Sequence, residues 1–115
     1  MSHRRVVVTG MGIVSPVGNT LASAWDSIRH GRSGIGPITV FDASAYATRI
    51  AGEVRGLDPK SFLPPKDVKK MDTFIHFGLA ASFQAMDDAG LEVTDANAER
   101  IGALIGSGIG GVRGI

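Results

Sequence analysis

The 115-residue sequence contains no cysteine. A thiolate nucleophile, a disulfide framework and a zinc–thiolate site are therefore excluded within this chain. No apolar run approaches the roughly 20 residues that a membrane-spanning helix needs. Near the amino terminus, the apolar run Val6–Val8 is interrupted at once by Thr9 and Gly10. We therefore expect no membrane segment and no secretory signal peptide, and we expect a cytoplasmic protein.

A strong charge of either sign is also missing. Lys and Arg number 12 against 11 Asp and Glu, which gives a net charge of +1. Because no global field would attract a polyanion, we predict no nucleic-acid partner. With 43% hydrophobic and 20% charged residues, the composition is typical of a globular protein, and the length suits one domain.

The stretch from Arg5 to Thr9 predicts a strand that is buried on both faces, because three consecutive valines show no polar alternation. The glycines that follow suggest a dinucleotide-binding loop at first. However, Ser15 stands where the third glycine of that pattern should be, and Pro16 falls in the first turn of the required helix. We therefore favour a core strand that enters a tight turn.

A second glycine-rich stretch, Ser107–Gly111, follows a predicted buried strand at residues 101–106. Gly106, Gly108 and Gly111 satisfy a Gly-x-Gly-x-x-Gly spacing, so phosphate binding is one interpretation. No Lys-Ser or Lys-Thr pair follows, which excludes a P-loop. An ordinary glycine turn between a strand and a loop is the alternative.

Apolar residues at helical spacing predict a first helix from about Leu21 to Ile28, capped by Asn19 or Thr20 and ended by Gly31. Trp25 should anchor it in the core. Residues 31–46 are predicted to be a loop that Phe41 and Tyr46 hold against the core. A short strand is expected within residues 49–54.

A second helical region is predicted from Lys66 to Ala89, with a break near Met71 and Asp72. Asp72 can cap its second part, and Gly90 can end it. Apolar residues surround the second part, which predicts a buried helix, and the small side chains of Gly78, Ala81 and Ala85 would allow close packing. The order strand, helix, short strand, helix, strand predicts an α/β fold in which the two main strands pair in parallel.

Lys66, Lys69 and Lys70 have the spacing of one helical face, which would attract an acidic partner. A solvated helix end is the simpler alternative. The predicted role of His76 is structural, and Asp87–Asp88 is expected to be a surface pair. We predict no metal site and no cofactor.

Several separated stretches, in this order, resemble the β-ketoacyl-acyl carrier protein synthases of the synthase II type. They are Val6–Thr20, Gly31–Ile35, Phe41–Tyr46, Lys70–Asp72 and Ile105–Gly111. The resemblance implies a thiolase-like, layered α/β/α/β/α fold, of which residues 1–115 would be the amino-terminal part. It also implies decarboxylative condensation of an acyl-enzyme with malonyl-acyl carrier protein, and a homodimer for the full-length protein.

The resemblance further implies that Gly108 and Ile109 line the acyl pocket, and that Lys66, Lys69 and Lys70 dock the acyl carrier protein. The family's cysteine nucleophile and its two catalytic histidines match no position here, so we expect an amino-terminal piece that is inactive alone. Two alternatives stay open: a non-catalytic module that binds a carrier protein, and a small nucleotide-binding domain. The sequence does not separate fatty-acid synthesis from polyketide synthesis.

Overall fold

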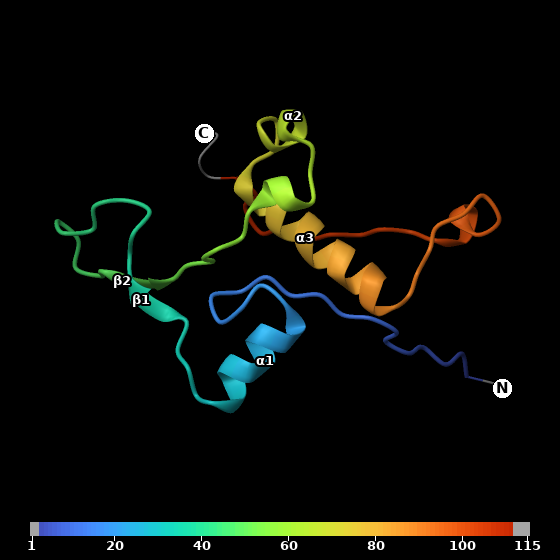
Figure 1. Ribbon diagram of the computed structural model, residues 1–115, viewed down its shortest axis with the longest axis horizontal. Helices are drawn as coiled ribbons and strands as arrows, with labels where there is room; N and C mark the ends of the chain where they lie inside the picture. Colours follow the sequence, from blue (N-terminus) through green and yellow to red (C-terminus); the bar gives the residue numbers. More distant parts are fainter. Residues whose placement is uncertain (1–2, 112–115) are drawn as a thin grey trace.

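The computed structural model describes residues 3–111 and has one long helix at its centre (Figure 1). In chain order the elements are α1 (Leu21–Arg29), β1 (Ile35–Pro37), β2 (Ile50–Gly52), a 3-10 turn (Pro59–Ser61), α2 (Pro65–Val68), α3 (Thr73–Asp88) and a second 3-10 turn (Ala98–Arg100). Within the described range, no helix has the length and apolar character needed to cross a membrane.

Helix α1 has the ends that the sequence predicts. The Thr20 hydroxyl accepts a hydrogen bond from the Ser23 backbone N–H, and the Ser23 side chain accepts one from the Thr20 N–H, which makes a reciprocal capping box. At the other end, Gly31 adopts a φ of 61°, a left-handed conformation that costs little only in glycine. Local signals therefore fix both ends of this helix.

Helices α2 and α3 confirm the predicted break. Helix α2 ends at Val68, and the Asp72 carboxylate accepts a hydrogen bond of 2.6 Å from the Thr73 N–H to begin α3. Helix α3 ends before Gly90, whose φ is 60°. The two predicted halves are therefore separate helices joined by a short turn.

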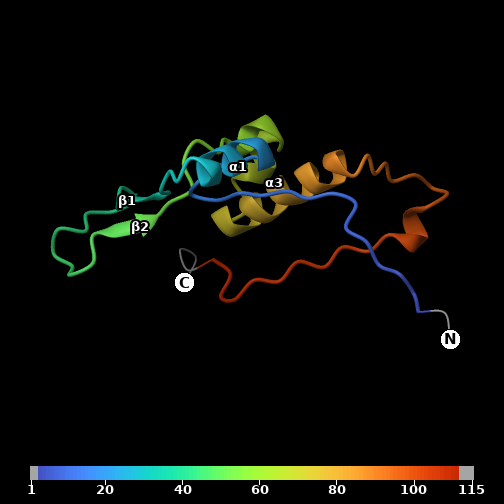
Figure 2. The same cartoon turned by 90° about the horizontal axis from the view of Figure 1, so that it is seen from below.

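The β1–β2 hairpin projects from the body of the molecule (Figures 1 and 2). Its strands pair antiparallel, with Gly36 opposite Ala51. Strand β2 lies within the predicted strand at 49–54, but β1 falls inside the predicted loop at 31–46. That prediction was wrong because Gly36 and Pro37 look like strand breakers, whereas an edge strand tolerates proline when its missing N–H would face solvent.

The predicted parallel pairing of residues 5–9 with residues 101–106 is wrong. Both segments are extended, but neither belongs to a sheet, and no backbone hydrogen bond joins them in the described part of the chain. They instead run in the same direction along α3 (Figure 2). A strand needs a neighbour that satisfies its polar backbone, and a helix cannot supply one because its own groups are already paired.

Gly10 and Gly12 bring the amino-terminal segment directly against the backbone of α3. A Cβ atom at Gly12 would collide with the Ala81 carbonyl, and one at Gly10 would collide with the Ala85 carbonyl. The Met11 N–H next to them donates to the Asp88 carboxylate at 2.9 Å. The predicted close packing on Ala81 and Ala85 is thus confirmed, and glycine is required on the facing segment.

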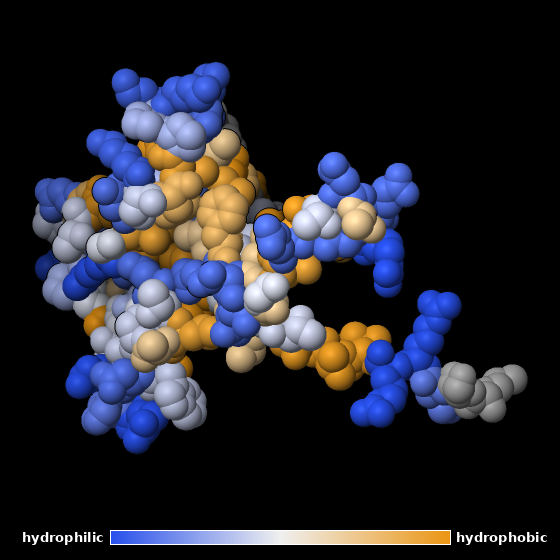
Figure 3. Space-filling view, turned by 45° about the vertical axis from the view of Figure 1, so that its right-hand side comes forward, coloured by the Kyte–Doolittle hydropathy of each residue, from blue (hydrophilic) through white to orange (hydrophobic). Residues whose placement is uncertain are grey.

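The buried core is small. Among the described residues, the buried apolar side chains are Ala24, Ala43 and Ala80 only. Trp25 is 61% exposed, and Phe41 and Tyr46 stack edge to face on each other while remaining exposed, so their predicted burial was wrong. Helix α3 is only partly buried rather than enclosed. Figure 3 shows the result as a broad apolar area with polar groups at its margins.

Candidate functional site

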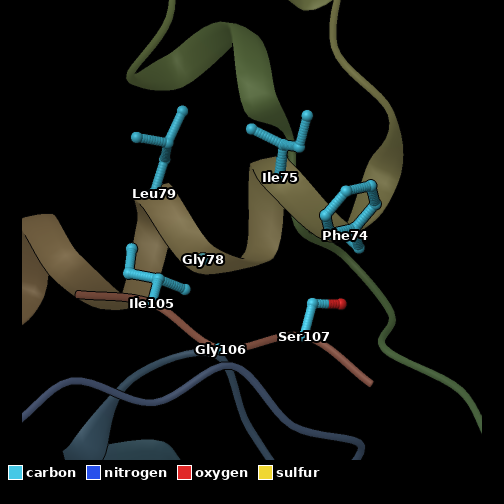
Figure 4. Close-up of a pocket in the computed structure, with 7 residues that line it drawn as sticks. All are labelled: Phe74, Ile75, Gly78, Leu79, Ile105, Gly106 and Ser107. Carbon is cyan, nitrogen blue, oxygen red and sulfur yellow. The ribbon is translucent and has the colours of Figure 1, made fainter. Parts of the chain in front are cut away.

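The main candidate site is an apolar pocket between α3 and the extended segment that follows residue 104 (Figure 4). Its volume is about 420 Å³. Helix α3 supplies one wall and the extended segment the other. The lining residues are Phe74, Ile75, Gly78, Leu79, Ile105, Gly106 and Ser107.

Gly78 sets the width of this pocket. The Ile105 methyl group Cγ2 lies 3.8 Å from the position that a Cβ at Gly78 would take, so Ile105 sits directly against the helix. Figure 4 shows the Ile105 side chain turned toward α3, with Phe74 and Ser107 at the other end of the pocket. Because no titratable group among residues 3–111 lines it, the pocket suits an uncharged apolar ligand rather than acid–base chemistry.

Gly108 and Ile109 lie just beyond this pocket and do not line it. The Gly110 N–H donates to the Ser107 hydroxyl at 3.1 Å, so these residues form a turn. The Ile109 side chain is 81% exposed at this turn. In the described part of the chain, Ile109 is thus exposed and lies two residues after Ser107, the last lining residue.

The same turn is a poor phosphate site. Gly111 packs against the Asp72 side chain, close enough that a Cβ at Gly111 would collide with it. This carboxylate also accepts the hydrogen bond of the first N–H of α3, that of Thr73. N–H groups at the start of a helix are the donors that bind phosphate in glycine loops. A negative group at the loop would repel a phosphate, which disfavours the nucleotide interpretation.

Sequence reasoning missed a second hollow, of about 460 Å³, between the hairpin and the start of α3. Glu53 lies in its wall and organises the hairpin. Its carboxylate accepts hydrogen bonds from the Thr39 N–H at 2.8 Å, the Thr39 hydroxyl at 2.7 Å and the Val40 N–H at 3.2 Å. The bonds from Thr39 hold the pKa of Glu53 below its ordinary value. Thr39 and Glu53 lie 14 positions apart in the sequence, so no local sequence pattern predicts the hydrogen bonds between them.

The three lysines lie together around the end of α2. Lys66 is in the helix, and Lys69 and Lys70 follow it in a turn. All three are exposed, and no ion pair found among residues 3–111 involves them. Their positive charge is therefore available to a partner, although the helix is too short to present them as one regular helical face.

Two other titratable residues that the sequence singles out, His76 and Asp88, both lie on α3. His76 is buried on α3, at 8% exposure, and its Nε2 atom has no hydrogen-bond partner among the described residues. Asp88 is held by the Met11 N–H, as described above. Within the described range, no group of three or more His, Asp or Glu side chains could hold a metal ion.

Comparison with known proteins finds matches that extend over almost the whole chain. The family model "Beta-ketoacyl synthase, N-terminal domain" matches residues 3–114. The chain is 55% identical over 112 residues to 3-oxoacyl-(acyl-carrier-protein) synthase 2 of Vibrio harveyi, and 51% identical over 113 residues to the protein of the same name from Synechocystis. These matches cover 97% and 98% of this chain, but it spans only 27% of each of these curated relatives.

A solved structure, the ishigamide ketosynthase/chain length factor, is similar in fold as well. The TM-score is 0.69 at 34% sequence identity, and the match covers 84% of this chain and 23% of the solved one. The agreement covers most of the described fold, including regions without regular secondary structure.

Proposed function

Since the chain belongs to the β-ketoacyl synthase family, we propose that it forms the amino-terminal part of a 3-oxoacyl-(acyl-carrier-protein) synthase 2. Its fold is accordingly part of the thiolase-like ketosynthase fold. The observation that carries the proposal is the 55% identity to the Vibrio harveyi enzyme across 97% of this chain. The proposed setting is fatty-acid elongation in the cytoplasm, by a homodimer of the complete synthase.

The proposed reaction is decarboxylative condensation of an enzyme-bound acyl group with malonyl-acyl carrier protein. It needs a nucleophile that carries the acyl group, and the 115 residues contain no cysteine. In this proposal the chain contributes binding surfaces, and the covalent chemistry belongs to other parts of the synthase. The 115 residues alone are expected to be inactive.

The proposed acyl-binding role rests on the apolar wall formed by α3 and residues 105–107. Gly108 and Ile109 follow the last lining residue, Ser107, in sequence, and in the complete synthase the branched Ile109 side chain would limit how far an apolar chain extends. A contribution from the rest of the synthase is required, because Ile109 is exposed in this chain.

The proposed carrier-docking role belongs to Lys66, Lys69 and Lys70. Acyl carrier proteins are acidic, and exposed lysines that form no ion pair within residues 3–111 would steer and orient them. A triple change of these lysines to glutamate should abolish carrier binding at low salt. The matched control is Lys60→Glu, an exposed lysine outside this group, which should bind nearly as the unchanged chain does.

The experiment that tests the function is a chimera. The matched quarter of the Vibrio harveyi synthase is replaced by residues 3–114 of this chain, and condensation of acyl groups with malonyl-carrier is measured. We expect activity, and we expect Ile109→Ala to shift the preference toward longer acyl chains. A folded, dimeric but inactive chimera beside an active parent would refute the proposal. The non-catalytic carrier-binding module would then be the better interpretation.

A further inference from the structure

The last part of the described chain is attached to α3 at two places. The first is Ile105, whose Cγ2 methyl group lies against Gly78, as described above. The second is the pair Gly110–Gly111, which is half-buried, whereas residues 102–109 are exposed. Ile109 therefore belongs to a short span that is held at both ends.

The second attachment depends on the start of α3. The Phe74 ring lies against Gly110, with its Cζ atom 3.5 Å from the position that a Cβ at Gly110 would take. The Asp72 side chain packs so closely on Gly111 that a Cβ there would collide with the Oδ2 atom and lie 2.6 Å from Cγ. Any residue other than glycine at position 111 would therefore push the turn away from Asp72.

The two oxygens of Asp72 face different groups. Oδ1 accepts the hydrogen bond of the Thr73 N–H, which fixes the orientation of the carboxylate at the start of α3. Oδ2 faces Gly111, so the side chain that begins the helix also holds the turn. A side chain whose own rotamer is fixed in this way can support a neighbouring site precisely.

We propose that Asp72 is a positioning residue for acyl-chain selection: by holding Gly111, it fixes the far end of the span that carries Ile109. The proposal rests on the proposed function, in which Ile109 limits the length of the acyl chain. Without the Asp72 contact, Ile109 would be held from the Ile105 side alone. A side chain with loose support sets a poor steric limit, so longer acyl chains would be accepted.

Capping of α3 is the simpler role for Asp72, and the two roles have different consequences. Loss of a cap lowers stability and with it the amount of active protein, which reduces the rates for all acyl chains by the same factor. Loss of position changes the ratio between the rates for a long and a short acyl chain in one sample. The matched control is Asp72→Asn, which keeps the shape of the side chain and an oxygen that can accept from the Thr73 N–H.

The test uses the chimera described above and measures condensation of hexanoyl and tetradecanoyl groups. Asp72→Ala and Gly111→Ala should each raise the ratio of the long-chain to the short-chain rate at least about twofold, the size at which coupling between residues in contact begins. Asp72→Asn should leave this ratio unchanged. In the Ile109→Ala background, Asp72→Ala should add no further shift, because the side chain that it positions is already absent. Equal losses for both acyl groups in Asp72→Ala, or a further shift in that background, would overturn the proposal.

A second readout does not depend on activity. Hydrogen exchange of the chimera, followed by mass spectrometry on a peptide that contains residues 105–111, reports on the Gly110 N–H that closes the turn. Asp72→Ala should speed this exchange, and Asp72→Asn should not. An inactive chimera with this exchange pattern would count against the proposed function alone. An active chimera whose exchange is unchanged by Asp72→Ala would refute the positioning role.

Discussion

Replacing Gly12 with alanine is the sharpest test of how the amino-terminal segment is held on α3. The added Cβ would collide with the Ala81 carbonyl oxygen and lie 2.9 Å from the Ala85 nitrogen. Both are atoms of a helix backbone, which cannot move aside as a flexible side chain would. The segment must therefore lift away, which weakens the Met11–Asp88 hydrogen bond.

The expected cost is about 1–3 kcal/mol, the range for overpacking a well-packed site. In urea, with a slope of about 1–3 kcal/mol per molar, this lowers the unfolding midpoint by about 1 M. Circular dichroism at the helical band follows the transition, since α1 and α3 give most of the signal. The matched control is Gly106→Ala, where an added Cβ meets nothing within 4 Å. Equal midpoints for the two variants would refute the packing argument.

Two further predictions concern local hydrogen bonds. Thr20→Ala removes the capping box of α1 and should cost about 0.5–2 kcal/mol of stability, measured by the same urea titration. Thr20→Ser keeps the hydroxyl and should retain most of that stability. An unchanged unfolding midpoint for Thr20→Ala would contradict the role of this cap. Glu53 has a folded-state pKa below its ordinary value of 4.5, so its stabilising contribution is present above that value and is lost as the pH falls through the folded pKa. The protection factors of the Thr39 and Val40 amides, which correct for the slower intrinsic exchange in acid, should therefore fall as the pH is lowered. Glu53→Gln should remove this pH dependence, and its persistence in that variant would show that another group is responsible.

The helices could be predicted because their signals are local. Thr20, Gly31, Asp72 and Gly90 each mark a helix end through a contact within a few residues, and all four act as the sequence predicts. The break between α2 and α3 could be predicted from the sequence for the same reason. The hairpin was found only in part, because whether Pro37 ends a strand or lies on an edge depends on a partner 13 residues away.

Burial and strand pairing could not be predicted from residue type alone. Assigning Trp25 or Val7 to a core assumes that the core is complete within the chain, and the exposed surface shows that it is not. The candidate pocket also depends on a distant contact, between Gly78 and Ile105. The sequence identified the small residues of α3 as a place of close approach, but it did not show which segment would approach each of them.

The bare valines of residues 5–9 have a consequence for synthesis on the ribosome. These residues would leave the exit tunnel early in a synthase as long as the relatives. At about 5–20 residues per second, roughly 300 further residues take on the order of 15 to 60 seconds to translate. Throughout that interval an apolar, unpaired strand is available to any passing chain. In a synthase of that length, burial of these valines would have to wait for chain that is translated later.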